Sequence, residues 1–328
     1  MNPLRAGLLL ALFLLATPSA RAAAPLTRVV MTTGSFAERE GVVYVAQDQG
    51  FFRKYGVDLS FVQVRSGPVG MASLAAGESQ FHWGSVTAAN LGAIAEGADI
   101  VFIAGFINKL TGAFVVNSKI RSPQDIKGKT LGVNSLSGGG WMFTMLALDH
   151  WGLEPKRDGI SIRALGSDGV RADALSSGVI DGCQIGYTFA ALLQNKGFRV
   201  LADLEKLSIP YQGSGLMARR AFVTSQPVVV ENTLRGLLDA VAFIRNRENR
   251  AAVMKSLARG LRLSRVEDAE EGWHSIVDIY EKKIYPSTDG IGNVIRLLGT
   301  TNEKVRRLKA ADLVETSAVR KLEKEGRF

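Results

Sequence analysis

The sequence is nearly free of cysteine and histidine, which limits the chemistry open to it. Cys183 is the single cysteine of 328 residues, and histidine occurs only at His82, His150 and His274. One cysteine cannot form an internal disulfide or a multi-cysteine metal site, and the three histidines stand far apart in the chain. Cys183 lies in the apolar stretch 180–185, where a small buried side chain is expected. We therefore predict no metal centre and no cofactor.

Long runs of one charge are also missing. The chain has 40 Lys and Arg against 31 Asp and Glu, a formal net charge of +9, without a block of five or six like charges. Basic clusters interleaved with aromatics, which nucleic-acid readers need, are absent as well. The spread positive charge suits a protein that attracts anions and gives no reason to expect a nucleic-acid partner.

Two further absences argue against an enzyme and against a membrane span. The sequence has no G-x-S-x-G elbow, and no pair of carboxylates recommends itself as a general acid and base. The apolar run from Ala6 to Ala16 is about half of the ~20 residues that a membrane helix needs, and Pro18 breaks the chain soon after it. With Arg5 before the run and small residues after it, residues 1–22 have the anatomy of a secretory signal peptide. We expect cleavage near Ala22-Ala23 and a periplasmic mature chain with no membrane span.

The remainder alternates short β-branched runs with helical stretches, a pattern typical of the α/β class. From about Gln226 onward the chain becomes helical and charged, with Pro227 suited to a first helical turn. The ten expected strands are 28–32, 58–64, 80–83, 100–104, 112–117, 130–134, 160–165, 182–185, 199–202 and 215–218.

A weak internal repeat divides this pattern into two halves. Each half opens with a strand and a loop of small residues, at 29–35 and again at 131–140. Each half then has a helix that ends in glycine, followed by a strand that ends at a second glycine, at 74–85 and at 175–187. Such a pattern also arises by chance. If it is real, it predicts two similar lobes with a cleft between them, on which the loops 32–36, 83–87, 134–141 and 185–188 converge.

The loop from Ser135 to Trp141 is the sharpest local feature. Its three glycines, Gly138 to Gly140, would let a ligand approach the backbone, and Ser137 is a candidate N-cap of the next helix. Unpaired N–H groups at the start of a helix favour an anion. The alternative is a flexible turn without a ligand. Neutral donors on the other loops, such as Thr33, Ser35 and Ser85, would complete an anion site, and aromatic residues would form its apolar wall.

Among the aromatics, Trp83 and Trp141 are the first candidates for the cleft, followed by Phe36 and Tyr187, although each is individually more typical of a core. Asp168 is expected to serve a cap or a turn. Three basic residues could reach the cleft, but nothing separates them from ordinary surface charge, so they are left out of the candidate site: Arg39, Arg65 and Arg171.

Four blocks of the sequence, in order between residues 41 and 227, resemble the NitT/TauT family of substrate-binding proteins of ABC importers. They are Gly50-Phe-Phe-Arg-Lys-Tyr-Gly-Val-Asp-Leu-Ser60, 74–89, Ile120-Arg-Ser-Pro-Gln-Asp-Ile-Lys-Gly-Lys-Thr-Leu-Gly-Val133 and 175–187. The chain also resembles the related binding proteins for thiamine-pyrimidine precursors. The resemblance implies a two-lobed periplasmic-binding-protein fold of type II, each lobe a mainly parallel sheet flanked by helices. It further implies lobe 1 from residues 23–111 and 214–328, and lobe 2 from residues 112–213.

In function, the resemblance implies a monomeric receptor that closes by a hinge on a small anionic solute and delivers it to an importer with permease and ATPase subunits. Members of the family bind nitrate, sulfonates, aromatic acids or thiamine precursors, and Tyr187-Thr188 departs from their common pattern, which leaves the solute open. The ligand loops of the family fall on Thr33, Gly34, Ser35, Phe36, Trp83, Gly84, Ser85, Ser137, Gly138, Gly139, Trp141, Gly186 and Tyr187.

An enzyme of the thiamine-pyrimidine synthase type is the alternative on the same fold. That family depends on a cysteine-rich iron motif, and this chain has one cysteine and a predicted export signal. A sensor that binds the same solutes without transport is a further alternative.

Overall fold

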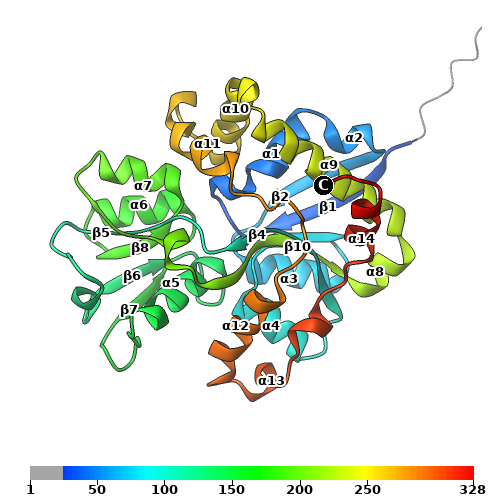
Figure 1. The fold of residues 1–328 in the computed structure, drawn as a ribbon. Helices are drawn as coiled ribbons and strands as arrows, with labels where there is room; N and C mark the ends of the chain where they lie inside the picture. Colours follow the sequence, from blue (N-terminus) through cyan, green and yellow to red (C-terminus); the bar gives the residue numbers. More distant parts are fainter. Residues whose placement is uncertain (1–24) are drawn as a thin grey trace, which may run out of the picture.

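The computed structural model describes residues 25–328, so the predicted signal peptide and its cleavage site lie outside the described residues. Two five-stranded sheets, each flanked by helices, form two lobes (Figure 1). The predicted α/β class and two-lobed fold are confirmed. Each of the ten expected strands is present, with ends that differ by up to five residues.

The sheet of lobe 1 has the strand order β2-β1-β3-β10-β4, and that of lobe 2 has the order β7-β6-β8-β5-β9. In each sheet one strand runs antiparallel to its two neighbours, β10 in lobe 1 and β5 in lobe 2, and the other pairings are parallel. The chain crosses between the sheets after β4 and again after β9. The residue boundaries expected for the lobes stay a prediction. The strands are β1 (Thr27–Thr33), β2 (Val57–Gln63), β3 (Phe81–Gly84), β4 (Ile100–Lys109), β5 (Ala113–Val116), β6 (Thr130–Val133), β7 (Ser161–Ala164), β8 (Gly182–Ile185), β9 (Arg199–Asp203) and β10 (Pro210–Arg219).

The internal repeat corresponds to the same topology built twice. β1 and β6 each take the second place in their sheet, between β2 and β3 in one lobe and between β7 and β8 in the other. The two helix–glycine–strand units lead through Gly77 and Gly178, both with positive φ, into β3 and β8. Glycine adopts this conformation without a steric cost, which is why both helices end there.

Helices cover both faces of each sheet. In lobe 1, α9 packs on α1, α2 and α14, while α3 and α4 lie on the other side; in lobe 2, α6 and α7 pack together and α5 lies opposite (Figure 1). The helices are α1 (Gly41–Asp48), α2 (Phe51–Lys54), α3 (Gly67–Ala76), α4 (Ala88–Ala95), α5 (Gly139–His150), α6 (Asp168–Ser176), α7 (Tyr187–Gln194), α8 (Arg220–Ser225), α9 (Pro227–Arg245), α10 (Arg250–Leu261), α11 (Glu270–Val277), α12 (Thr288–Gly299), α13 (Glu303–Arg306) and α14 (Ser317–Lys324). The 3₁₀ helices are η1 (Glu38–Glu40), η2 (Pro123–Ile126), η3 (Leu204–Leu207), η4 (Arg247–Asn249), η5 (Val266–Ala269) and η6 (Ala310–Leu313).

Among residues 25–328, three apolar clusters hold the fold together. One lies in lobe 1 beneath α1 and α9, and one lies in lobe 2 beneath α6 and α7 and includes the buried Cys183. The third joins the two lobes: Phe143 of α5 packs edge-to-face on Tyr211 of β10, with ring centroids 5.1 Å apart. The strands that cross between the lobes therefore run through a shared apolar core.

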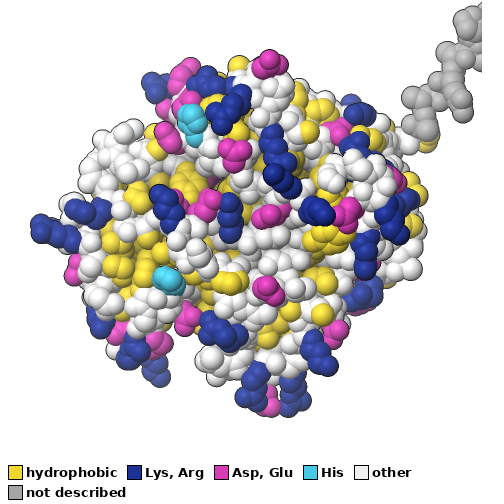
Figure 2. Space-filling view, viewed as in Figure 1, with side chains coloured by type: hydrophobic (Ala, Val, Ile, Leu, Met, Phe, Trp, Pro, Cys, Tyr) yellow, Lys and Arg dark blue, Asp and Glu magenta, His cyan; other side chains and the backbone are white. Residues whose placement is uncertain are grey.

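On the surface, Lys and Arg side chains are scattered over the visible face rather than gathered in one patch (Figure 2). Within residues 25–328, no helix combines the length and the apolar character required to cross a membrane. The same part of the chain has no cluster of three or more His, Cys, Asp or Glu side chains arranged to hold a metal ion.

Candidate functional site between the lobes

The loops at the strand tips of the two lobes meet. Ser85, after β3, lies so close to Gly139 of α5 that a Cβ on Gly139 would stand 2.9 Å from the Ser85 hydroxyl oxygen. The backbone N–H of Ala89 in lobe 1 donates to the carbonyl oxygen of Ser137 in lobe 2 at 3.1 Å. The glycine-rich turn of one half therefore faces the β3 turn of the other.

A cavity of about 660 Å³, here called the central cavity, opens between the lobes. Lobe 1 contributes the loop after β1, the end of β2 and the end of α10. Lobe 2 contributes Asn134, Gln184, Phe189 and the loop from Leu165 into α6. The volume lies within the range of small-molecule sites.

A smaller space of about 30 Å³, here called the inner gap, borders the central cavity. Gly34, Ser35, Arg39 and Asn134 line both spaces. The rest of its lining includes Thr33, Glu40, Trp83, Gly84, Ser85 and Gly139. At this size the inner gap holds a water molecule or one small group.

Arg39 is a largely buried cation that lobe 1 contributes to the central cavity. Its guanidinium donates to the Ser35 hydroxyl, lies 3.3 Å from the Glu40 carboxylate and stacks 5.4 Å from the centre of the Phe143 ring in lobe 2. Burial by itself would lower the pKa of Arg39, but the surrounding carboxylates, Glu40 first, outweigh burial and raise it. Arg39 is therefore a fixed positive charge that contacts both lobes.

Asp168 and Arg171 form a buried ion pair on the lobe 2 side, with 2.6 Å between Oδ1 and Nη2. The other oxygen of Asp168 accepts the N–H of Gly186 at 2.7 Å, and Arg171 also donates to the carbonyl of Gly166. Because the two charges neutralise each other within lobe 2, the pair shapes the wall of the cavity more than it attracts an ion. Nε of Arg171 is nevertheless buried without a hydrogen-bond partner among residues 25–328.

Two exposed cations stand at the mouth, Arg65 after β2 and Arg262 after α10. Within residues 25–328, neither has a carboxylate oxygen within 4 Å, and Arg262 stacks over the Phe36 ring at 5.2 Å. The apolar part of the wall is formed by Leu165, Val170, Phe189, Leu192, Leu261 and Leu263. The central cavity thus combines free positive charge with apolar walls.

The structure places the candidate residues in three groups. Gly34, Ser35 and Phe36 line the central cavity, and Thr33, Trp83, Gly84, Ser85 and Gly139 line the inner gap. Ser137, Gly138, Trp141, Gly186 and Tyr187 border neither space.

The glycine-rich turn differs from the expectation in two ways. Gly138, not Ser137, is the N-cap of α5. The carbonyl oxygen of Ser137 instead accepts a hydrogen bond from Ala89 of lobe 1. The glycines are needed for packing inside the protein: a Cβ on Gly140 would stand 2.9 Å from the side-chain oxygen of Asn134, which already accepts the Gly140 N–H at 3.1 Å. Their small size lets the two loops approach each other, before any ligand is considered.

Trp141 is a correction. Because α5 starts at Gly139, Trp141 lies in its first turn on the side that faces α12, where it lines an outer groove with Met145, Leu297 and Leu298. The pitch of the helix turns it away from the central cavity.

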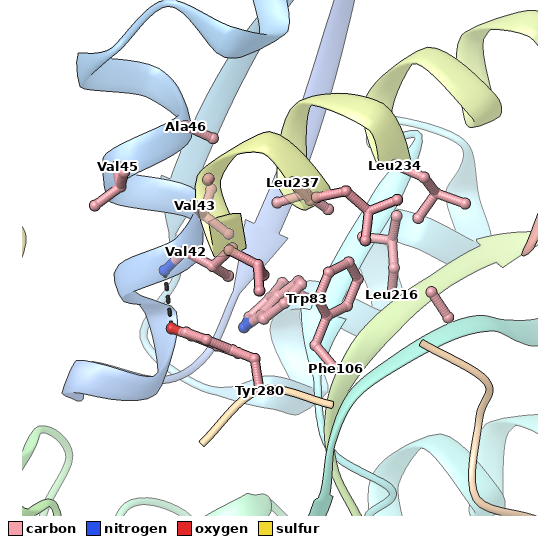
Figure 3. Close-up of a cluster of buried hydrophobic side chains, with 14 of the residues drawn as sticks. Val42, Val43, Val45, Ala46, Trp83, Phe106, Leu216, Leu234, Leu237 and Tyr280 are labelled. Atoms are coloured by element: carbon pink, nitrogen blue, oxygen red, sulfur yellow. Dashed lines mark hydrogen bonds between the residues drawn. The ribbon is translucent and has the colours of Figure 1, made fainter. Parts of the chain in front are cut away.

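Trp83 lines the inner gap and not the central cavity, because its ring is wholly buried. It packs 5.2 Å from Phe106 in the core of lobe 1, with its indole nitrogen directed to the side of Tyr280 (Figure 3). Side chains alternate along a strand, so Trp83 points to the same side of β3 as Phe81 and into the core. Its buried Nε1 has no hydrogen-bond partner among residues 25–328, and the inner gap reaches this residue.

Gly186 and Tyr187 are already engaged by carboxylates. The Gly186 N–H donates to Asp168, and the Tyr187 N–H donates to Glu38 Oε1 at 2.7 Å. The Tyr187 hydroxyl donates to Asp203 at 2.6 Å, and burial, together with this bond, raises its pKa. Neither residue is free to receive a solute anion in this arrangement.

The charged residues of the site were not among the candidates predicted from the sequence. Arg39, Arg65 and Arg171 all line the central cavity, together with Arg262, which no pattern suggested. One signal was available for Arg39, since it follows the loop 33–36 within one turn. No local signal indicated that Glu38 reaches the other lobe.

These features together define a two-lobed α/β fold with its candidate site in the cleft. A family model described as NMT1/THI5 like matches residues 40–251, more than half of the chain. The chain belongs to this family, which confirms the resemblance stated above. A search of curated protein sequences found no significant match.

Solved structures share the fold at low sequence identity. The alkanesulfonate-binding protein SsuA from Xanthomonas axonopodis pv. citri, bound to MOPS, is 20% identical with a TM-score of 0.73, over 90% of this chain and 100% of that chain. The periplasmic nitrate-binding protein NrtA from Synechocystis is 12% identical with a TM-score of 0.73, over 92% of this chain and 89% of that chain. The desulfurization enzyme DSZB is 15% identical with a TM-score of 0.59, over 91% of this chain and 99% of that chain. At these identities the likeness establishes the fold alone.

Proposed function

We propose that this protein is the periplasmic solute-binding receptor of an ABC importer, and that it is not an enzyme. It binds one small anionic solute in the central cavity, closes around it by rotation of the lobes and presents it to the permease and its ATPase. The observation that carries the proposal is the central cavity itself, lined by both lobes and supplied with Arg39, Arg65 and Arg262. The fold shared with a sulfonate-binding and a nitrate-binding protein supports it.

The cavity also bears on the class of solute. A volume of about 660 Å³ is far larger than an ion such as nitrate, and its wall includes several apolar side chains. A sulfonate, a carboxylate or a thiamine precursor with an apolar part fits better, the acidic group on Arg39 and the apolar part against Phe36 and Phe189. Neutral donors from Ser35, Asn134 and Gln184 would complete the contacts.

A thermal-shift screen tests the proposal. Sulfonates, carboxylates, nitrate and thiamine precursors are added to the mature protein, and a ligand that binds only the folded state raises its melting temperature. For the best compound, Arg39→Ala should weaken binding on the order of tenfold or more, because a charge-assisted hydrogen bond is lost. Trp141→Ala, which alters the outer groove, is the matched control and should leave the affinity unchanged.

Two outcomes would contradict the proposal. If no anionic compound raises the melting temperature, or if Arg39→Ala binds as tightly as wild type, the central cavity is not the anion site proposed here. Iron-dependent turnover of the bound compound would favour an enzyme instead. Loss of signalling without loss of uptake in a deletion strain would favour a sensor over a transport receptor.

A further inference from the structure

A carboxylate from lobe 1 occupies the start of a helix in lobe 2. Glu38, the first residue of η1, is 3% exposed, and its Oε1 accepts the backbone N–H of Tyr187, the first residue of α7, at 2.7 Å. The preceding N–H, that of Gly186, donates to Asp168 of lobe 2 at 2.7 Å. Two successive amides at the start of α7 are therefore each paired with a carboxylate, one from each lobe.

The surroundings leave room for this carboxylate and little else. A Cβ on Gly186 would overlap Glu38 Oε2, so only glycine at this position lets Glu38 approach α7. On the lobe 1 side, a Cβ on Gly272 of α11 would lie 3.3 Å from Glu38 Cβ and would overlap the Thr188 hydroxyl. Glycines from both lobes thus make the space in which Glu38 sits.

Opposing electrostatic effects act on the Glu38 carboxylate. The first turn of α7 presents unpaired N–H groups and a partial positive charge, which favour an anion. Burial raises the pKa of Glu38, and the nearby negative charge of Asp168 adds to the rise. Oε2 of Glu38 is buried without a hydrogen-bond partner in the described chain. The Glu38 backbone, the Tyr187 amide of α7 and the charge of Arg39 favour the ionised form.

We propose that Glu38 is the resident anion of the α7 N-terminus and a specificity-determining residue of the cleft. It takes the place that a solute anion would otherwise occupy, holds the two lobes together there and leaves Arg39 to bind the acidic group of the solute. Only the last part of this inference rests on the proposed function.

The first experiment needs no solute. Glu38→Ala vacates the space, and acetate, a free carboxylate of matching size, is titrated into the variant while the melting temperature is followed. A saturable rise is expected in Glu38→Ala and in neither wild type nor the control Glu78→Ala, which removes an exposed acid of lobe 1. Hydrogen exchange at the Tyr187 amide should be roughly tenfold faster in Glu38→Ala and should slow again with acetate.

Glu38→Gln guards against a variant that does not fold. It keeps the volume and an acceptor oxygen but removes the charge, so the Tyr187 amide should again exchange faster than in wild type. The inference is overturned if acetate stabilises Glu38→Ala no more than it stabilises wild type. If Glu38→Ala does not fold and Glu38→Gln does, the inference is overturned when the Tyr187 amide of Glu38→Gln exchanges hydrogen at the wild-type rate.

The second experiment uses the solute found by the screen and separates the two proposals. In Glu38→Ala, acetate should leave solute affinity unchanged or improve it, because the acidic group of the solute binds at Arg39. Competition between acetate and solute would place the solute at α7 and overturn the specificity role. A screen without any binding compound would defeat the proposed function and leave the acetate and exchange results valid.

Discussion

Replacing Glu40 by glutamine should make the protein more stable at neutral and alkaline pH. Glu40 is fully buried, its Oε2 accepts the Ala37 N–H at 2.9 Å, and its Oε1 lies 3.3 Å from Nε of Arg39. Burial raises the pKa of Glu40 from 4.5 to about 7, although the charge of Arg39 acts in the opposite direction. Because the pKa is higher in the folded than in the unfolded state, the folded state holds the proton more tightly.

The sign and size of the effect follow from this difference. Below about pH 4.5 both states carry the proton and Glu40 causes no loss. As the pH rises from about 4.5 to about 7, the unfolded state releases the proton while the folded state keeps it, and the free energy of unfolding falls. The rise from 4.5 to about 7 corresponds to a loss of about 3 kcal/mol, complete near pH 8.

Glu40→Gln stays neutral at every pH and should escape this loss. Urea unfolding of wild type and variant between pH 4 and pH 8 should give curves that nearly meet at the acidic end. At pH 8 they should differ by about 3 kcal/mol in favour of Glu40→Gln, or by on the order of 5 °C in melting temperature. Glu78→Gln, an exposed control, should follow wild type throughout. Parallel curves for wild type and Glu40→Gln would refute the reasoning, because they would show that Glu40 does not take up a proton in this range.

Three further measurements test other buried groups. Gly260→Ala places a Cβ that would overlap the Tyr44 ring, so it should lower the free energy of unfolding by about 1–3 kcal/mol in urea titrations. Gly292→Ala, in open space on α12, is its control and should raise the free energy of unfolding slightly. Equal effects of the two variants would contradict the close packing of Gly260 on Tyr44. Burial lowers the pKa of His82 to about 4, so the NMR signals of its ring should show no titration between pH 5.5 and pH 8. The stability that neutral His82 contributes should be lost only as the pH falls from about 6.5 toward 4, because the unfolded state then takes up a proton that the folded state refuses. Burial raises the pKa of the Cys183 thiol to about 12, so iodoacetamide at pH 8 should alkylate Cys183 in urea but not in the native protein. Rapid alkylation of the native protein would mean that this part of lobe 2 opens.

The fold could be predicted from the sequence because its strands and helices depend on local residue patterns. Apolar β-branched runs formed strands at each of the ten expected positions, and glycines after helices ended them, as at Gly77 and Gly178. The repeat of these patterns predicted two equivalent sheets, which the matching strand orders confirm. Neither the antiparallel course of β5 and β10 nor the apolar core shared by the lobes has such a local signature.

The candidate site was harder to predict from the sequence than the fold, because the neighbouring residues in the sequence do not show how far a residue lies from the cleft. Phe36 and Trp83 both follow or end a strand and both are aromatic, yet Phe36 lines the central cavity while Trp83 is buried in the core. The direction of a side chain at the end of a strand depends on the register with its neighbours. Here β3 pairs with β1 and β10 so that Trp83 points beneath α1 and α9.

Taken alone, the sequence determined the class of fold, its two halves and the loops that face one another, since these follow from the order and period of apolar residues and from the positions of glycine. Only the tertiary structure decided which charges gather between the lobes. Arg39, Arg262 and Glu38 look like ordinary surface residues in the sequence, and each gains its role from a partner in another part of the chain: the Phe143 ring, the Phe36 ring and the first amide of α7. Because such partners are brought together by the packing of two lobes, no short stretch of sequence contains both members of the pair.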